Sequence, residues 1–281
     1  MKRKNEKNEK AENVLLLDDC LFSFLKEPRR GRIHGIHRRA LSLDCGELIT
    51  LLSENELTPY SLVVPGIDFR RLPIPPSSEA TLNSTEIRFE KISFDLSRAE
   101  RIPQPSLELV FRPQRLVRNL DYFERYVEGF GRFDGYRLLQ PRIKKIEEVE
   151  DYDSLVGVGP GLTPSGDDFL MGVFLALYGF SRAGIELPLR KKLQRTLLFE
   201  GTTRESLHLL SMARTDRFSH AWISLIGSLF CQESLTIESE AWKQLNVSQL
   251  LKRGATSGTD AAMGLLHGLR IGFAEMTGRI S

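Results

Sequence analysis

A glycine- and proline-rich stretch at residues 156–168 reads V-G-V-G-P-G-L-T-P-S-G-D-D and leads directly into the apolar segment Phe169–Phe180. Four glycines and two prolines in so short a span are typical of a shaped loop, and the apolar segment is typical of a buried helix. Thr163 is a natural N-cap with Pro164 at the first helical position, and Ser165 is a second candidate for the cap. The stretch therefore predicts a loop-to-helix junction.

Such a junction is suited to binding an anion. The first turn of a helix has backbone N–H groups without helical partners, and the helix dipole places partial positive charge at the same end. Hydroxyl groups such as those of Thr163 and Ser165 add further donors. The expected ligand is a phosphate or a carboxylate, approached by a backbone that includes Gly159, Gly161 and Gly166.

The motif recurs about ninety residues later in the chain. Ser257-Gly258-Thr259-Asp260 followed by Gly264 matches Ser165-Gly166-Asp167-Asp168 followed by Gly172, so that Ser, Gly, Asp and the later Gly fall at the same offsets. We interpret this second occurrence of the S-G-x-D-x-x-x-G motif as a second loop-to-helix junction. Its candidate binding residues are Thr256, Ser257, Gly258 and Asp260.

Small residues recur on one face of each helix that follows a junction. An interior helical Gly costs about 1 kcal/mol relative to Ala, so repeated Gly on one face usually marks the close approach of another backbone. The two stripes are Gly172, Ala176 and Gly179 in the first helix, and Gly264, Gly268 and Gly272 in the second. We therefore predict that the two helices cross closely, and that both N-termini face one pocket if the helices run parallel.

Three carboxylates complicate an anion site at these junctions, namely Asp167, Asp168 and Asp260. An ionised carboxylate repels a phosphate unless it is turned away, caps a helix, or is bridged to the ligand by a cation. Helix capping, Mg²⁺ coordination and general acid–base catalysis are therefore three open uses, and no cofactor is firmly implied. Asp167 has no acidic counterpart in the second copy, where Thr259 stands, which favours a specific role for Asp167.

The spacing of apolar and turn residues along the chain predicts an α+β fold with a β-rich N-terminal part and a mainly helical C-terminal part. We expect a disordered tail at residues 1–13, a small antiparallel sheet or barrel within residues 14–112, and helices within residues 113–281. Predicted strands are residues 32–39, 41–45, 47–52, 61–64 and 86–96, with an irregularity near Glu90 and Lys91. The Pro- and Ser-rich segment Leu72–Ser84 predicts a long surface loop.

The C-terminal part shows helical spacing of apolar residues and several helix start signals. Thr202, Thr203 and Ser206 follow Gly201 and are typical of a helix start, with Thr203 as the cap. Predicted helices are Pro164–Phe180, Leu187–Gly201, Thr203–Ala213, Phe218–Cys231 and Ser257–Met276.

Composition restricts the class of protein. The chain has 281 residues, 41% hydrophobic and 27% charged, and its three cysteines form no C-x-x-C pair, which favours a globular protein of a reducing cytoplasm. The first residues lack a signal-peptide pattern, and the longest uncharged stretch is shorter than the ~20 residues of a membrane span. A net charge of +2 and an arginine cluster without interleaved aromatics give no support to nucleic-acid binding.

Three stretches carry a resemblance to a known family, namely Gly157–Leu170, Thr202–Ser206 and Gly254–Asp260. They resemble a bacterial family catalogued as a domain of unknown function and described as carboxylases. Its best characterised members are similar to the AllH-type subunit of oxamate carbamoyltransferase, which works beside FdrA-like and AllG-type subunits in anaerobic allantoin breakdown. The resemblance covers most of the chain beyond the first dozen or so residues.

The resemblance implies a subunit that takes part in carbamoyl transfer between phosphate and the nitrogen of oxamate, forming or breaking oxalurate. Carbamoyl phosphate and oxamate are both anions, so this step suits the predicted pocket, with Thr163, Ser165, Asp167 and Asp168 as catalytic candidates. The resemblance also adds Thr202, Thr203 and Ser206 to the residues expected to line it.

Two other functions remain open. One alternative is a non-catalytic subunit that binds an anionic metabolite or presents it to partner chains. An ATP- or biotin-linked carboxylase is disfavoured, because the sequence has no Walker-type G-K-[ST] run and no biotin-carrier-like Met-Lys pair.

Overall fold

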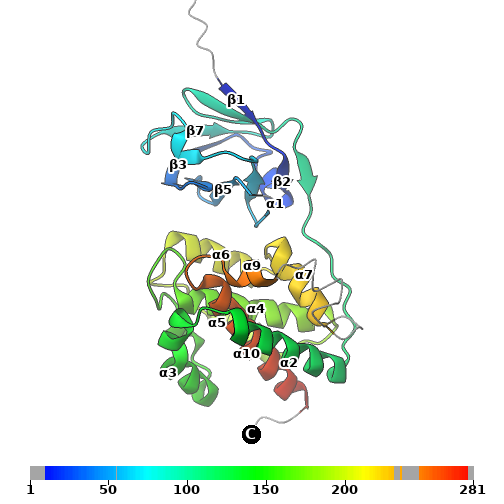
Figure 1. The fold of residues 1–281 in the computed structure, drawn as a ribbon. Helices are drawn as coiled ribbons and strands as arrows, with labels where there is room; N and C mark the ends of the chain where they lie inside the picture. The colour runs from blue at the N-terminus through cyan, green and yellow to red at the C-terminus, as the bar shows by residue number, and fades with distance from the viewer. Residues whose placement is uncertain (1–9, 55, 231–234, 236–246, 278–281) are drawn as a thin grey trace, which may run out of the picture. The chain divides into compact units, whose positions relative to one another are not determined.

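The computed structural model describes residues 10–54, 56–230, 235 and 247–277. The chain divides into two compact units, Met1–Gln104 and Pro105–Ser281, which are described separately (Figure 1). The first is built on a sheet and the second on helices, so the predicted α+β class is confirmed. The division falls after Gln104, because the segment that follows packs on the helices. The backbone oxygen of Leu107 accepts hydrogen bonds from the Arg182 guanidinium at 2.8 and 2.6 Å, and Phe111 contacts Phe180.

The first unit contains a ten-stranded mixed sheet in the order β1-β9-β8-β7-β3-β4-β5-β6-β2-β10. Most neighbouring strands are antiparallel, as predicted, but the pairs β1–β9, β5–β6 and β2–β10 are parallel. The strands are β1 (Lys10–Asn13), β2 (Leu16–Asp18), β3 (Arg29–Ile36), β4 (Ala40–Asp44), β5 (Leu48–Leu52), β6 (Ser61–Val63), β7 (Glu79–Leu82), β8 (Glu86–Arg88), β9 (Ile92–Asp95) and β10 (Glu100–Ile102). A short helix, α1 (Asp19–Phe24), and a 3-10 turn, η1 (Phe69–Arg71), complete the unit.

The sheet differs from the sequence prediction at three places. Lys10–Asn13 form strand β1 rather than part of a disordered tail, while residues 1–9 lie outside the described residues. Strand β7 lies inside the predicted loop 72–84, where Ala80 and Leu82 are buried. The predicted strand 86–96 is two strands, because a tight turn, with the Phe89 N–H donating to Ile92 O at 2.9 Å, reverses the chain between them.

The second unit is a helical assembly around α4, which is buried along nearly its whole length. Its elements are α2 (Pro113–Phe130), α3 (Asp134–Val149), η2 (Tyr152–Leu155), α4 (Ser165–Arg182), α5 (Pro188–Thr196), α6 (Arg204–Arg214), α7 (His220–Leu229), α9 (Val247–Leu251) and α10 (Ser257–Thr277). All five predicted helices are present, although α5 ends before Gly201 and the predicted end at Cys231 lies outside the described residues. Within the described ranges, no helix is long and apolar enough to cross a membrane.

Helices α4 and α10 cross closely and in parallel, which confirms the prediction from the glycine stripes. A Cβ added at Gly172 would lie 2.0 Å from the backbone oxygen of Ala261, and one added at Gly264 would lie 1.9 Å from that of Phe169. Further along, Gly268 lies against Ala176. The two contacts are equivalent, because 172 and 264 differ by the same 92 positions as 169 and 261. The helix pair therefore has a local two-fold relation.

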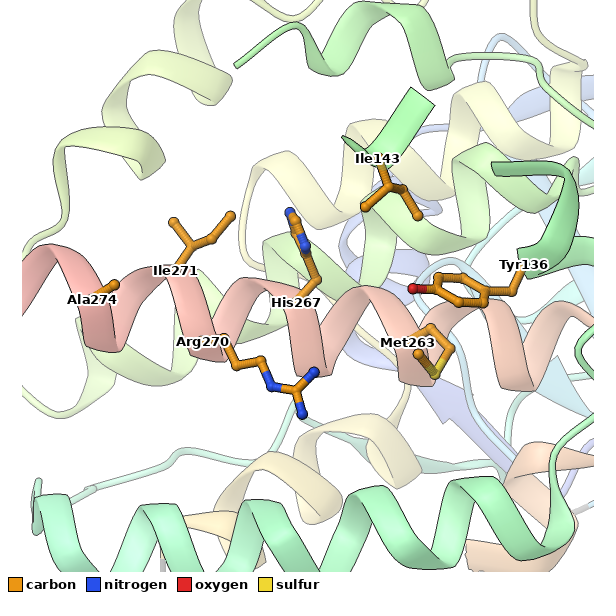
Figure 2. Close-up of a pocket in the computed structure, with 7 residues that line it drawn as sticks. All are labelled: Tyr136, Ile143, Met263, His267, Arg270, Ile271 and Ala274. Atoms are coloured by element: carbon orange, nitrogen blue, oxygen red, sulfur yellow. The ribbon is translucent and has the colours of Figure 1, made fainter. Parts of the chain in front are cut away.

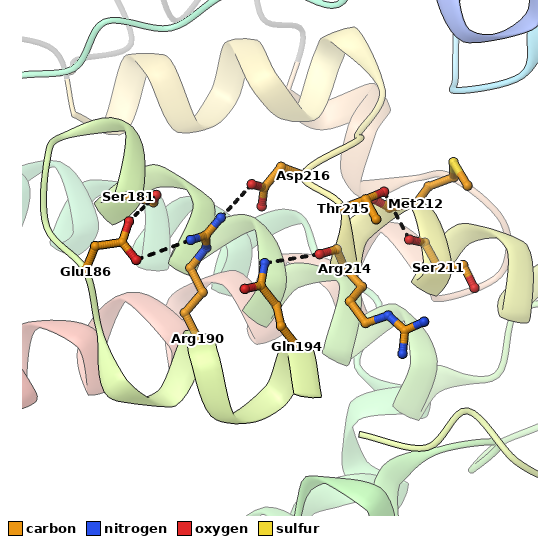
Figure 3. A network of polar contacts seen from close by, with 9 residues as sticks. All are labelled: Ser181, Glu186, Arg190, Gln194, Ser211, Met212, Arg214, Thr215 and Asp216. Atoms are coloured by element: carbon orange, nitrogen blue, oxygen red, sulfur yellow. Dashed lines mark hydrogen bonds and ion pairs between the residues drawn. The ribbon is translucent and has the colours of Figure 1, made fainter. Parts of the chain in front are cut away.

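A polar network joins α5 to the rest of the helical unit (Figure 3). The Arg190 guanidinium donates to Asp216 at 2.5 Å and to Glu186 at 3.4 Å, and Glu186 in turn accepts from the Ser181 hydroxyl at 2.8 Å. Gln194 donates its side-chain N–H to the backbone oxygen of Arg214 at 3.1 Å. These contacts tie α5 to the C-terminal end of α6 and to the turn that follows it.

Candidate functional site

The two S-G-x-D junctions come together at the starts of α4 and α10. The Thr163 and Ser257 hydroxyls are 2.9 Å apart, although the two residues are 94 positions apart in sequence. Both hydroxyls lower the pKa of Asp168, which places them beside its carboxyl group. One half of the site therefore consists of Asp168, Thr163 and Ser257, drawn from both junctions.

The other half is similar with the helices exchanged, although its threonine, Thr256, corresponds in the repeat to Pro164 and not to Thr163. This half consists of Asp260, Thr256 and Ser165. A Cβ added at Gly135 would lie 2.3 Å from Asp260 Oδ2, 2.3 Å from Ser165 Oγ and 2.6 Å from Thr256 Oγ1, so these three oxygens converge on one point. The first turn of α3 thus lies over this half, in which Ser165 and Asp260 are buried and Thr256 is partly exposed; in the first half Asp168 is buried, and Thr163 and Ser257 are partly exposed.

The helix caps differ from those predicted. Helix α4 begins at Ser165 with Pro164 in the cap position, and no side chain caps it. Thr163 does not cap α4, because its hydroxyl is engaged with Ser257 instead. Asp168 and Asp260 do not complete capping boxes either, since no backbone N–H in the described part of the chain donates to Asp168 Oδ2 or to either oxygen of Asp260 in good geometry.

The backbone donors lie in the loop rather than in the first helical turns. The Gly166 N–H donates to Val158 O at 2.8 Å and the Gly258 N–H to Arg253 O at 3.2 Å, so both are occupied. By contrast, the N–H groups of residues 159, 161, 162 and 163 have no protein acceptor among the described residues. Gly159 and Gly161 have φ values of +119° and +98°, a conformation that glycine adopts readily, and Pro160 between them has no N–H to donate.

Asp167 holds this loop in place. Its Oδ1 accepts from the Gly157 N–H at 2.9 Å, and its Oδ2 accepts from the Thr202 hydroxyl. The Thr203 hydroxyl donates to Leu162 O at 2.5 Å and also caps α6 by accepting from the Ser206 N–H at 3.1 Å, as predicted for a cap. Thr202 and Thr203 therefore support the loop from outside, while Ser206 is buried at 1% exposure.

Thr259, which stands where Asp167 does in the first copy, also ties a loop. Its hydroxyl accepts from the Arg132 N–H at 2.8 Å and lies 3.3 Å from Leu251 O, to which it donates. Asp167 and Thr259 therefore play the same role in the two copies, because each holds a neighbouring loop by side-chain hydrogen bonds. In one copy the bound loop is 157–163, and in the other it is the connection between α2 and α3.

Asp168 and Asp260 are buried without a charged partner. Asp168 is 5% exposed and Asp260 is 0% exposed, and no Lys, Arg or His among the described residues pairs with either. Burial raises the pKa of Asp168 well above its ordinary range; the Ser257 hydroxyl opposes this, and the charge of Asp260 adds to it. Burial also raises the pKa of Asp260. The hydroxyls of Thr256 and Ser165 and the Tyr136 N–H lower that pKa, but their effect is smaller.

The carboxylates do not form a ready-made metal cage. Within the described ranges there is no group of three or more His, Cys, Asp or Glu side chains arranged to hold a metal ion. Asp167 is directed to Gly157 and Thr202, so Asp168 and Asp260 are the two carboxyl groups left for a cation. Mg²⁺ is commonly held by one or two carboxylates together with substrate phosphates, and this donor set fits such an ion only if the substrate completes it.

We expect Gly135→Ala to damage the site more than the fold. The new Cβ would displace the Asp260, Ser165 and Thr256 oxygens, while the gain in helix propensity of up to about 1 kcal/mol offsets part of the strain. Anion affinity by calorimetry should fall while the far-UV circular dichroism stays that of the wild type. Gly129→Ala, where a Cβ meets nothing within 4 Å, is the control. Equal affinities for both variants would show that the α3 contact does not shape the site.

A cavity that the sequence analysis did not anticipate lies between α3 and α10, with a volume of about 270 Å³ (Figure 2). It is lined by Tyr136, Ile143, Met263, His267, Arg270, Ile271 and Ala274. Burial lowers the pKa of His267 to about 4, so that its imidazole is neutral at pH 7. The Tyr136 side chain lines this cavity, and its backbone N–H lowers the pKa of Asp260. Tyr136 therefore contacts both the cavity and the half of the site that contains Asp260.

Comparison with known families shows which family the chain belongs to. The family described as "Oxamate carbamoyltransferase subunit AllH" matches residues 155–269, which include both junctions, and the "AllH family N-terminal domain" matches residues 13–101. The two matches together cover most of the chain, and this chain belongs to the AllH family. No curated protein and no solved structure matches it.

Proposed function

We propose that this chain is the anion-binding subunit of an oxamate-type carbamoyltransferase, with the substrate held at the junction of loop 157–163, α4 and α10. One observation carries the proposal: two sequence-distant S-G-x-D junctions converge on a site with hydrogen-bond donors. The donors are the loop N–H groups that have no protein acceptor among the described residues, and the Thr163–Ser257 hydroxyl pair, whose hydrogens would turn from one another and from Asp168 to a bound anion. Family membership supplies the reaction class, and the donors match the charge of carbamoyl phosphate and oxamate.

The donors suit the chemistry of carbamoyl transfer. In that reaction the nitrogen of oxamate and a phosphate oxygen exchange the carbamoyl carbon, and negative charge collects on the phosphate and on the carbamoyl oxygen. Neutral N–H and O–H donors fixed in place stabilise such charge without reorganisation, and each is worth more when buried than in water. No covalent nucleophile is needed for direct transfer between the two substrates.

The individual residues take different roles in this proposal. Thr163 and Ser257 contact the anion, with Ser165 and Thr256 in the covered half beside them. Asp167, whose two oxygens are both bonded, is a positioning residue for the loop, together with Thr202 and Thr203. Gly159 and Gly161 supply the backbone conformation that leaves the loop N–H groups free.

A presenting subunit is the second candidate function, and one observation favours it. Among the described residues, the two halves of the site contain hydroxyl, amide and carboxyl groups, and its hydrogen bonds include no His, Lys or Cys side chain. The groups that move protons during transfer would then come from FdrA-like and AllG-type subunits. In that case the chain holds one substrate while its partners perform the reaction.

Calorimetry of the purified full chain against carbamoyl phosphate, phosphate and oxamate, with and without Mg²⁺, tests the proposal. Thr163→Val and Ser257→Ala each remove one hydroxyl, and each should weaken binding roughly tenfold or more. Ser154→Ala, whose hydroxyl bonds Asp151 O away from the site, should bind like the wild type. Equal binding by all four proteins would place the anion elsewhere.

Turnover in the complex reconstituted with FdrA-like and AllG-type subunits separates the two candidate functions. If this chain contributes to the chemical step, Thr163→Val should lower kcat with assembly retained. If it only presents the substrate, the same variant should raise KM and leave kcat near that of the wild type.

A further inference from the structure

The three carboxyl groups at the site are in three different situations. Asp167 accepts two hydrogen bonds and needs nothing more. Both oxygens of Asp260 are buried without a hydrogen-bond partner in good geometry, and the first turn of α3 lies over them. Asp168 Oδ2 is likewise buried and has no hydrogen-bond partner among the described residues, but Asp168 lies beside the hydroxyls of Thr163 and Ser257, whose side chains are partly exposed. Of the two unpartnered carboxyl groups, Asp168 is therefore the one beside the proposed ligand contacts.

An ionised Asp168 would conflict with its surroundings. A buried carboxylate without a partner is strongly unfavourable, so such a group acquires either a proton or a cation. It would also repel an anion bound by the neighbouring hydroxyls. The charged groups that face it increase the conflict, because they are the carboxylates Asp260 on α10 and Asp167 on its own helix.

A proton suits this place better than a metal ion. The described residues lack a cluster of three metal-binding side chains, and the positive ends of the α4 and α10 dipoles disfavour a metal ion. The same dipoles favour the ionised form of Asp168, but burial opposes them and is the largest influence on its pKa, which lies well above the ordinary range.

We propose that Asp168 is a neutral carboxylic acid that donates a hydrogen bond from Oδ2 to an oxygen of the bound anion, beside Thr163 and Ser257. This inference rests on the proposed function, because it needs an anion at that site. It gives the substrate class more closely: an oxyanion with an oxygen free to accept from an acid, as in a phosphate or the carboxylate of oxamate. It also makes binding depend on pH through a residue of the protein.

The expected pH dependence has a definite sign. Below the pKa of Asp168 the acid is protonated and donates, so affinity is at its highest. As pH rises through that pKa, the donor is lost and a negative charge faces the ligand, so affinity falls. A hydrogen bond to a charged acceptor accounts for roughly a tenfold to hundredfold change. Oxamate is the suitable probe, because its carboxylate stays ionised between mildly acidic and alkaline pH.

Asp168→Asn separates a neutral donor from a charged group. Asn has nearly the same shape and keeps an N–H donor at every pH, so the variant should bind oxamate as well as the wild type does at low pH and keep that affinity as pH rises. Asp216→Asn, at a half-buried carboxyl group away from the site whose pKa is also raised by burial, should leave the pH dependence of the wild type unchanged. Loss of low-pH binding in Asp168→Asn, or wild-type binding that requires Mg²⁺ and ignores pH, overturns the proposal.

The proton can also be observed without a ligand. Infrared difference spectra of wild type minus Asp168→Asn at neutral pH should show the C=O stretch of a protonated carboxyl. If this band is absent, Asp168 is ionised and the inference is wrong even if oxamate binds. If the band is present and no oxamate binds at any pH, the anion role of Asp168 and the proposed function fail together. Binding without pH dependence removes only the role of Asp168.

Discussion

Gly264→Ala should lower the free energy of unfolding by about 3 kcal/mol or more, or prevent the helical unit from folding. The added Cβ would lie 1.9 Å from the backbone oxygen of Phe169, and main chain inside a packed helix pair has little room to move. The gain of about 1 kcal/mol in helix propensity is too small to offset this overlap. Urea denaturation followed by far-UV circular dichroism measures the change.

Gly129→Ala is the matched control for this prediction. Gly129 is also a helical glycine, near the end of α2, but a Cβ there meets nothing within 4 Å. This variant should be as stable as the wild type or more stable by up to about 1 kcal/mol. Gly172→Ala should behave like Gly264→Ala, since its Cβ would lie 2.0 Å from Ala261 O. If the three variants have similar stabilities, the close crossing of α4 and α10 is not as described.

Asp167→Asn should weaken anion binding roughly tenfold or more while the chain remains folded. An amide whose oxygen accepts from the Gly157 N–H puts its NH₂ group against the Thr202 hydroxyl, which must turn to accept, so two hydrogen bonds to a charged group become weaker bonds between neutral groups. The expected loss in free energy of unfolding is about 1–2 kcal/mol, the difference between hydrogen bonds to a charged group and to a neutral one. Calorimetry with oxamate and urea denaturation measure the two effects separately.

A double-mutant cycle with Thr202→Val identifies the contact responsible. If Asp167 acts through the loop, the effects of the two substitutions on anion affinity should be strongly non-additive, because each disrupts the same hydrogen bond between Asp167 and Thr202. Additive effects would mean that Asp167 affects the ligand by another route. Asp153→Asn, at a carboxylate that accepts from the Leu198 N–H at 2.8 Å away from the loop, should leave the affinity of the wild type unchanged.

The parts of this fold that were predictable from sequence are those with a local signal. Glycine at helical spacing is enough to predict a close crossing, and a Thr followed three residues later by a small polar residue is enough to place the cap at Thr203. Strand β7 was missed because only Ala80 and Leu82 show alternation, within a segment rich in Pro and Ser. The parallel strand pairs depend on chain topology, for which a single strand has no signature.

The candidate site was predictable in its location and less so in its detail. The repeated motif named the residues that meet, but the motif alone does not show that Thr163 contacts Ser257 instead of capping its own helix. Gly135 was missed altogether, because a single glycine outside the motif gives no sign that its Cα faces three oxygens. Which acid is bonded and which is not depends on tertiary contacts. The sequence separates Asp167 from Asp168 only in that Thr259 stands at the position of Asp167 in the second copy.

The equivalent contacts of α4 and α10 have a consequence for how mutations at the crossing can be compensated. The two helices meet about a local two-fold relation, as the two halves of an isologous homodimer interface do, but within a single chain. The two sides therefore can differ, as they do at the Asp167 and Thr259 positions. At Gly172 and Gly264, however, the obstacle to a larger residue is the main chain of the other copy. No side-chain replacement opposite can relieve it, so a search for second-site suppressors at these two contacts should find none there.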